Sequence, residues 1–316
     1  MFRDTLAGMS DLPVPAPSPV SIDLDCLERL ALSGISAPNS RRAYSHALAD
    51  FVCWYRAGAR GPLSKLLVQD YRAQLESRGL APATINIRLS AIRRLAGAAA
   101  DAGLLPADVA ASVASVSGAR KLGARAGNWL TREQASALLQ APAADTLKGT
   151  RDRALLALLI GCGLRRAEIA GLDLAAIQQR DGRWVIVDLV GKGRRVRTVP
   201  IPNWTKAILD RWLAPAQIRD GKVFRPIDKA GRLAGDSITP KVVWWIVLHY
   251  AVPLGFGNLA PHDLRRTCAK LCRASGGDLE QIQLLLGHAS IQTTERYLGT
   301  RQNLTDAVND HLGLEL

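Results

Sequence analysis

Four short segments of this chain bring together side chain types that could act on a phosphate ester. They are GLRRAE at 163–168, GKG at 191–193, HDLRR at 262–266 and LGH at 286–288, the last followed nine residues on by Tyr297. Arginine can bind a phosphate through two parallel N–H bonds, and histidine and lysine can move protons. A phenol becomes a nucleophile when a base or a strongly positive site favours loss of its proton. Each residue alone is more often structural, so only the combination predicts a site.

Two of these residues lie together at the predicted start of a helix. Pro261 suits a first helical turn, which places His262 and Arg265 on one face. The apolar residues Leu264 and Cys268 lie on the other side. A helix N-terminus favours anions through its free N–H groups and its dipole. We therefore expect His262 and Arg265 to be presented away from the core, toward an anion.

A second arginine follows the glycine at position 163. Because this glycine interrupts the helix, Arg165 is well placed to project a second guanidinium into the same site. The alternative is an ion pair with Glu168, one turn further on. We expect Glu168 to orient Arg165 rather than to remove it from the site.

The elements that must position these residues are mainly helical. Helical spacing of apolar residues predicts helices at 39–58 (capped by Asn39 or Ser40), 64–78, 81–102, 150–162, from 203, 238–250, 261–275, 278–286, 290–298 and 303–312, and Thr131 is a predicted cap. Segments 184–190 and 195–201 predict a β-hairpin, with 191–194 at its tip and a tight turn at 181–182 before it. The expected fold is mainly α with a small antiparallel β-sheet.

Composition divides the chain into four parts. Residues 1–20, with four prolines, are a predicted flexible leader, and 21–116 are a predicted helical bundle. Residues 117–128, rich in glycine, alanine and basic side chains, are a predicted linker that could follow a phosphate backbone. A second domain is expected at 129–316.

In order and spacing, the motifs resemble the tyrosine recombinase family, the phage-type integrases that include Xer-like recombinases. The resemblance covers nearly the whole chain, and it implies an N-terminal helical, SAM-like core-binding domain followed by a catalytic domain. It implies a site-specific recombinase that cleaves and rejoins DNA through a 3′-phosphotyrosyl intermediate, with strand exchange in a tetramer. The implied roles are phosphate binding by Arg165 and Arg265, protonation of the leaving 5′ oxygen by Lys192, proton transfer by His262, a hydrogen bond to phosphate from His288, and nucleophilic attack by Tyr297.

We expect no cofactor and no metal. The predicted arginine, lysine and histidine set supplies positive charge without Mg²⁺, and no acidic cluster or phosphate-binding glycine loop is evident. A covalent intermediate would conserve the phosphodiester bond energy, so ATP is not required. Cys268 and Cys272 are interpreted as buried apolar residues, because no CxxC pair completes a zinc site.

The net charge of +13 indicates a polyanionic partner, expected to be double-stranded DNA recombination sites. Residues 1–40 sum to −3 and residues 298–316 to −2, which leaves +18 on residues 41–297. A solvated basic surface is the alternative for any single side chain. The candidate DNA-binding residues are Arg42, Arg88, Arg93, Arg120, Lys121 and Arg125.

The expected location is the cytoplasm, and the nucleoid when the protein is bound to DNA. The chain shows no secretory signal, no membrane-spanning run and an odd number of scattered cysteines. Self-assembly to a dimer or tetramer on DNA is expected, and accessory DNA-bending proteins are candidate partners. The apolar face of 303–316 is expected to pack either on a neighbouring protomer or on its own domain.

Two other functions use parts of the same pattern. A topoisomerase or a hairpin-forming resolvase would use the same tyrosine nucleophile, but the compact length and the N-terminal bundle disfavour it. A DNA-binding protein that has lost catalysis is the alternative from a different class. The presence of all six expected active-site residues argues against it.

Overall fold

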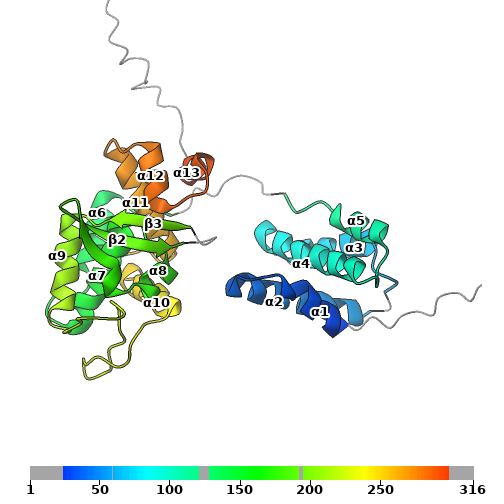
Figure 1. Ribbon diagram of the computed structural model, residues 1–316, viewed down its shortest axis with the longest axis horizontal. Helices are drawn as coiled ribbons and strands as arrows, with labels where there is room; N and C mark the ends of the chain where they lie inside the picture. Colours follow the sequence, from blue (N-terminus) through cyan, green and yellow to red (C-terminus); the bar gives the residue numbers. More distant parts are fainter. Residues whose placement is uncertain (1–23, 59, 121–127, 192–194, 299–316) are drawn as a thin grey trace, which may run out of the picture. The chain divides into compact units, whose positions relative to one another are not determined.

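In the computed structural model the chain divides into two units, residues 1–124 and 125–316, each with its own apolar core (Figure 1). The structure describes residues 24–58, 60–120, 128–191 and 195–298. The predictions for the leader, for Lys121, Arg125 and Lys192, and for the last helix at 303–312 lie outside these residues. Within them, no helix is both long enough and apolar enough to cross a bilayer.

The first unit is a bundle of helices around α4. Its helices are α1 (Leu24–Ser33), α2 (Pro38–Arg56), α3 (Lys65–Ser77), α4 (Pro82–Asp101) and α5 (Ala107–Ala114). Helix α4 contacts the other four, so its apolar side chains form the centre of the core. Ser64 caps α3 as predicted, because its hydroxyl accepts a hydrogen bond from the Leu67 amide. The prediction of Asn39 or Ser40 as cap of α2 is wrong: Ala37 holds that position, since Pro38 fits the first helical turn.

An ion cluster around Asp50 joins α2, α3 and α4. The Asp50 carboxylate accepts hydrogen bonds from the Tyr71 hydroxyl at 2.6 Å and from Arg88 at 2.5 Å, and Arg78 donates at 3.2 Å. Arg88, a candidate DNA-binding residue, is only 8% exposed, so little of its side chain is free to contact DNA. A helix packed against four others has little free surface, and a buried guanidinium needs a carboxylate partner.

The segment after α5 packs against the first unit. The Asn86 side chain accepts a hydrogen bond from the Ala119 amide at 2.8 Å and donates to the Ala119 carbonyl at 3.0 Å. Arg93, a predicted DNA contact, donates to the carbonyl of Val116 and is half-buried. Residues 117–119, predicted as the start of the linker, are thus held against the first unit, because Asn86 of α4 bonds the backbone of Ala119 and Arg72 of α3 donates to the Ser117 carbonyl at 2.8 Å.

The second unit packs helices around α7. Its helices are α6 (Arg132–Gln140), α7 (Leu147–Gly161), α8 (Arg166–Gly171), α9 (Asn203–Leu213), α10 (Pro240–Ala251), α11 (Pro261–Ala274), α12 (Leu279–Leu286) and α13 (Ile291–Leu298), with a 3₁₀ turn at Leu174–Ala176. The apolar residues of α7 from 154 to 160 are buried on every side, as expected for a central helix. The predicted cap Thr131 forms a capping box with Gln134.

A three-stranded antiparallel sheet completes this unit. Its strands β1 (Ile177–Arg180), β2 (Arg183–Val190) and β3 (Val196–Pro200) are hydrogen-bonded in the order β1-β2-β3. The predicted hairpin corresponds to β2 and β3, and the predicted turn at 181–182 joins β2 to β1, a strand that the sequence did not indicate. The predicted fold class, mainly α with a small antiparallel sheet, is confirmed.

The Asp50 cluster gives a first prediction. Asp50→Asn should lower the free energy of unfolding of the first unit by about 2 kcal/mol, because Arg88 loses its carboxylate. Burial opposes ionisation of Asp50, but hydrogen bonds from Tyr71 and Arg78 and the charge of Arg88 outweigh it and lower the pKa. The carboxylate therefore stabilises the fold above the unfolded pKa near 3.9, and the difference from wild type should vanish as pH falls through the folded pKa.

Hydrogen exchange of the full chain, read by mass spectrometry on peptides from α2 to α4, measures this effect. The exposed Asp70→Asn in α3 is the matched control. Equal protection in the two variants would contradict a stabilising role of the cluster.

Candidate active site

The structure brings five of the six predicted catalytic residues to one place in the second unit. Arg165 precedes α8, His262 and Arg265 lie on α11, His288 follows α12, and Tyr297 lies on α13. Lys192 lies outside the described residues. Its neighbour Gly191, at the end of β2, is so close to Arg165 that an added Cβ would lie 3.1 Å from Nη1. The start of the predicted hairpin tip therefore borders the site.

Arg265 is buried beneath the site. The side chain is 1% exposed, and its two terminal nitrogens donate to the carbonyl oxygens of Gly163 and Leu286. The prediction that Arg265 is presented away from the core is wrong, because α11 packs against both α7 and α12 at this point. Burial, together with the charge of Arg165, lowers the pKa of Arg265 to about 10, so the guanidinium stays charged at neutral pH.

Gly163 makes room for this arrangement. Its φ of 58° is in the left-handed region, which favours glycine. A Cβ at this position would lie 3.0 Å from Leu286 Cδ2 and 3.3 Å from Cys268 Sγ. The glycine of the GLRRAE segment thus lets the chain turn after α7 while its carbonyl faces Arg265.

Glu168 orients two arginines at once. Its carboxylate accepts hydrogen bonds from Arg165 Nη1 at 2.7 Å and from both terminal nitrogens of Arg197 at 2.9 Å. It also accepts one from the Arg165 backbone amide at 2.8 Å. Burial raises the pKa of Glu168, but the hydrogen bonds from Arg197 and the Arg165 amide outweigh this and lower it. Arg165 forms the ion pair that sequence offered as its alternative, and it still lines a cavity.

Arg197 is a residue that the sequence reasoning missed. It lies on β3, and its Nε donates to the carbonyl of Leu285 at 3.1 Å, beside the bidentate pair with Glu168. Arg197 therefore connects the hairpin, the start of α8 and the end of α12. Three predicted site residues belong to or adjoin these elements: Lys192, Arg165 and His288. The alternating pattern of 195–201 placed Arg197 on a strand, but no sequence signal names a partner 29 residues away.

Two histidines flank the tyrosine. The Tyr297 ring meets the rings of His262 and His288 edge-on, with centroids 5.3 and 5.2 Å apart. Its hydroxyl donates to the backbone carbonyl of His262 at 3.0 Å. His288 Nδ1 forms a hydrogen bond of 2.9 Å with the hydroxyl of Thr294, a buried residue of α13. This bond ties the turn before α13 to the helix that carries Tyr297.

Burial and positive charge set the protonation of these groups. Burial raises the pKa of Tyr297 to about 12, although the charges of Arg265 and Arg266 act against it. Burial and the nearby arginines lower the pKa of His288 to about 4, and burial with Arg265 also lowers that of His262. At neutral pH the phenol is therefore protonated, while the imidazoles are neutral and able to accept a proton.

The site opens into a cavity of about 410 Å³. The residues that line it are Arg165, Arg166, Ala167, Trp244, Ala260, Pro261, His262 and Arg265. Three arginines in the lining of one such cavity favour an anionic ligand with several acceptor oxygens. Among the described residues, no group of three or more His, Cys, Asp or Glu side chains is placed to hold a metal ion.

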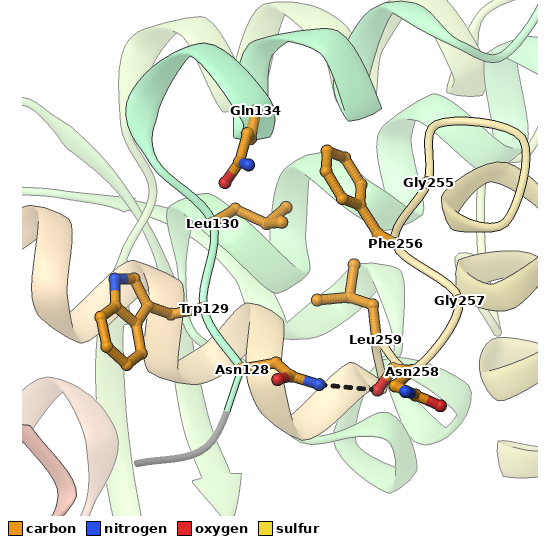
Figure 2. A pocket seen from close by; sticks show the side chains of 9 residues that line it. All are labelled: Asn128, Trp129, Leu130, Gln134, Gly255, Phe256, Gly257, Asn258 and Leu259. Carbon is orange, nitrogen blue, oxygen red and sulfur yellow. Dashed lines mark hydrogen bonds between the residues drawn. The ribbon is translucent and has the colours of Figure 1, made fainter.

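A second cavity, of about 370 Å³, lies at the start of the unit (Figure 2). Leu130, Phe256 and Leu259 point toward one another there, and the side chain of Asn128 donates to the carbonyl of Asn258 at 3.1 Å. None of the predicted catalytic residues that the structure describes lines this cavity.

Comparison with known proteins agrees with this geometry. The phage integrase family matches residues 128–303, more than half of the chain. The chain belongs to this family. The resemblance to the tyrosine recombinase family is confirmed. The prediction that the protein is an enzyme, a tyrosine-type site-specific recombinase, is also confirmed.

Similarity to individual relatives extends beyond the matched region. Tyrosine recombinase XerD of Pseudomonas aeruginosa is 31% identical over 275 residues, which cover 86% of this chain and 90% of the relative. Tyrosine recombinase XerC of Thermodesulfovibrio yellowstonii is 29% identical over 86% of this chain and 89% of its own.

Two solved structures show the same fold at low identity. A XerH site-specific recombinase, in a post-cleavage complex with its difH substrate, has a TM-score of 0.66 at 18% identity, covering 83% of this chain and 76% of its own. A lambda integrase dimer bound to a COC′ core site has a TM-score of 0.66 at 17% identity, covering 87% of this chain and 75% of its own.

Glu168 gives a second prediction. Glu168→Gln should lower the free energy of unfolding of the second unit by about 3 kcal/mol, because an amide NH₂ would face the N–H groups of Arg165 and Arg197. Since the folded pKa is lowered, the carboxylate stabilises the fold above an unfolded pKa near 4.3, and its contribution is lost as pH falls through the folded pKa.

Urea unfolding followed by tryptophan fluorescence measures this change, because six of the seven tryptophans belong to the second unit. The exposed Glu280→Gln in α12 is the control. A loss no larger than that of the control would show that the cluster adds nothing to stability.

Proposed function

We propose that this protein cleaves and rejoins DNA at specific sites through a 3′-phosphotyrosyl intermediate, with strand exchange in a tetrameric complex and without metal or ATP. The observation that supports this most directly is the shared site of Tyr297, Arg165 and Arg265 in a member of the phage integrase family. A phenol, two guanidiniums and two neutral imidazoles are the groups that an attack on a phosphodiester needs.

Arg165 and Arg265 bind the scissile phosphate. Both line the cavity, where Arg165 is held by Glu168 and Arg265 by two backbone carbonyls. The guanidiniums are charged before DNA arrives, so they do not have to reorganise when negative charge gathers on the non-bridging oxygens in the transition state. Such preorganised donors are worth several kcal/mol in a site that excludes water.

Cleavage and rejoining each exchange one P–O bond for another. The Tyr297 oxygen attacks phosphorus while its proton passes to a neutral imidazole, assigned to His262, and His288 donates a hydrogen bond to a phosphate oxygen. The bond from phosphorus to the 5′ oxygen breaks, and that oxygen takes a proton from Lys192. The 5′ hydroxyl of a second strand then reverses the reaction on the phosphotyrosine. Each broken P–O bond is replaced by another, so no ATP is consumed.

The partners follow from charge and from the family. We assign double-stranded DNA sites as substrate, bound largely through phosphate contacts and therefore weakened by salt. Among the predicted DNA-binding residues, Arg42 and Arg120 are exposed on the first unit and stay candidates, as do Lys121 and Arg125. Assembly on DNA as a dimer and then a tetramer, with accessory DNA-bending proteins, and a cytoplasmic, nucleoid-associated location belong to the same proposal.

The nucleophile gives the third prediction. Binding sites are first selected from a random genomic DNA library, and one is then made as a nicked substrate that traps the covalent intermediate. Wild type should become linked to the DNA, and Tyr297→Phe should not, because the substitution removes the attacking oxygen alone. An adduct on the Phe variant would show that Tyr297 is not the nucleophile. Covalent linkage without exchange between two sites would favour a topoisomerase instead.

The phosphate-binding arginine gives the fourth prediction. Arg165→Ala should keep DNA affinity within about threefold but lower the cleavage rate at least a thousandfold, because it removes charge stabilisation that counts most in the transition state. Gel shift and single-turnover cleavage measure the two quantities. A loss of binding equal to the loss of cleavage would mean that Arg165 is purely structural.

A further inference from the structure

Arg266 of α11 places its charged side chain against the tyrosine ring. Its guanidinium carbon lies 4.8 Å from the centroid of the Tyr297 ring, within cation–π distance. The neighbouring Arg265 lines the cavity, and its charge also acts on Tyr297. Of these two successive arginines of the HDLRR segment, Arg265 therefore serves both the cavity and the tyrosine, whereas Arg266 lies against the tyrosine ring.

The surroundings leave the charge of Arg266 largely available. Its nearest carboxylate is Asp263, one turn earlier, and the shortest N···O distance of 3.8 Å is long for an ion pair. The side chain is 16% exposed, so solvent screens it weakly. Its Nε is buried and has no hydrogen-bond partner among the described residues. A buried donor without a partner is costly, so such a group calls for an explanation.

Loss of the phenol proton would strengthen the contact between this cation and the ring. In the protonated state the guanidinium meets only the weak negative potential at the ring face. When Tyr297 becomes a phenolate, the ring and its oxygen carry a full negative charge next to the cation, and the attraction grows because the site is partly dry. The same cation also holds the ring between the two histidines in either state.

Arg265 cannot do the same once DNA is bound. In the proposed function a phosphate lies against Arg165 and Arg265, and its negative charge offsets theirs. That phosphate also opposes formation of a phenolate nearby. Arg266 lies against the ring and does not line the cavity, so the phosphate does not offset its charge and that charge still acts on the tyrosine.

We propose that Arg266 is a positioning residue for the nucleophile: it holds the Tyr297 ring in place and favours the phenolate when the DNA phosphate is bound. This inference rests on the proposed function of Tyr297. Arg266 keeps its protons throughout the reaction.

Other groups around the tyrosine bear on its pH dependence. The titratable and charged side chains that face it are His262, Asp263, Arg265 and Cys268 from α11 and His288 from the turn before α13. Asp263 and Cys268 raise the pKa of Tyr297, whereas Arg265 and Arg266 lower it against the larger effect of burial. The charge of Arg266 also lowers the pKa of His262. Removal of this charge should therefore raise the pKa of the nucleophile and that of its neighbouring base.

The test compares Arg266→Gln and Arg266→Lys with Arg273→Gln. Arg273 is an exposed arginine of the same helix that donates to the carbonyl of Gly277, so its loss is the matched control. The rate of adduct formation on the nicked substrate is measured from roughly pH 6 to pH 10, with DNA affinity in parallel. Arg266→Gln should lower the rate at pH 7 at least tenfold and move the rising limb of the profile up by about one pH unit.

Arg266→Lys keeps a cation and should restore a large part of both the rate and the pH midpoint. DNA affinity of the Arg266 variants should stay within twofold of wild type, and Arg273→Gln should behave as wild type. An unchanged pH profile of Arg266→Gln overturns the inference. So does a fall in DNA affinity that accounts for the whole loss of rate, since Arg266 would then be a DNA contact.

Circular dichroism checks that the variants fold. If Arg266→Gln does not, Arg266→Met, which keeps an apolar stem over the ring without charge, must show the same shift. The two proposals fail separately. If wild type forms no adduct through Tyr297, the proposed function is wrong. If wild type forms it and the uncharged Arg266 variants match wild type, only the role of Arg266 is wrong.

Discussion

The second unit depends on the burial of one charged side chain, Arg265. A guanidinium with 1% exposure must have its N–H groups satisfied by protein atoms, and here the carbonyls of Gly163 and Leu286 provide the oxygens. Those carbonyls come from the chain after α7 and from the end of α12. The turn at Gly163, the end of α12 and the packing of α11 between them are therefore parts of one arrangement.

Positive charge accumulates around that arrangement with little compensation. Arg165, Arg197 and Arg265 lie close together, and the buried carboxylate of Glu168 pairs with the first two. The resulting field, added to burial, keeps His288 neutral. The same burial holds the phenol of Tyr297 protonated, so the site is ready for a phosphate but its nucleophile still needs a base. These features explain why an anionic substrate would complete the site electrostatically.

Local sequence signals predicted the elements well, and they failed where distant partners decide. Proline and cap residues fixed the starts of α3, α4 and α6 to within a residue or two, because those interactions lie within one helical turn. Arg88 shows the limit: it was a candidate for DNA binding, but it is buried and pairs with Asp50, 38 residues earlier. Likewise, composition made 117–119 a linker, although Asn86 binds it to the first unit.

By itself the sequence determined the family and the mainly helical fold, and it named the five residues of the candidate site that the structure describes. It could do so because motif order and helical periodicity can be read directly from the order of the residues. Tertiary structure alone decided how the arginines differ. Arg265 is buried, Arg197 binds Glu168, and Arg266 lies against Tyr297. The physical reason is that the state of a guanidinium depends on which carboxylate, carbonyl or ring folding brings within about 5 Å. Here those partners lie as far as 102 residues away along the chain.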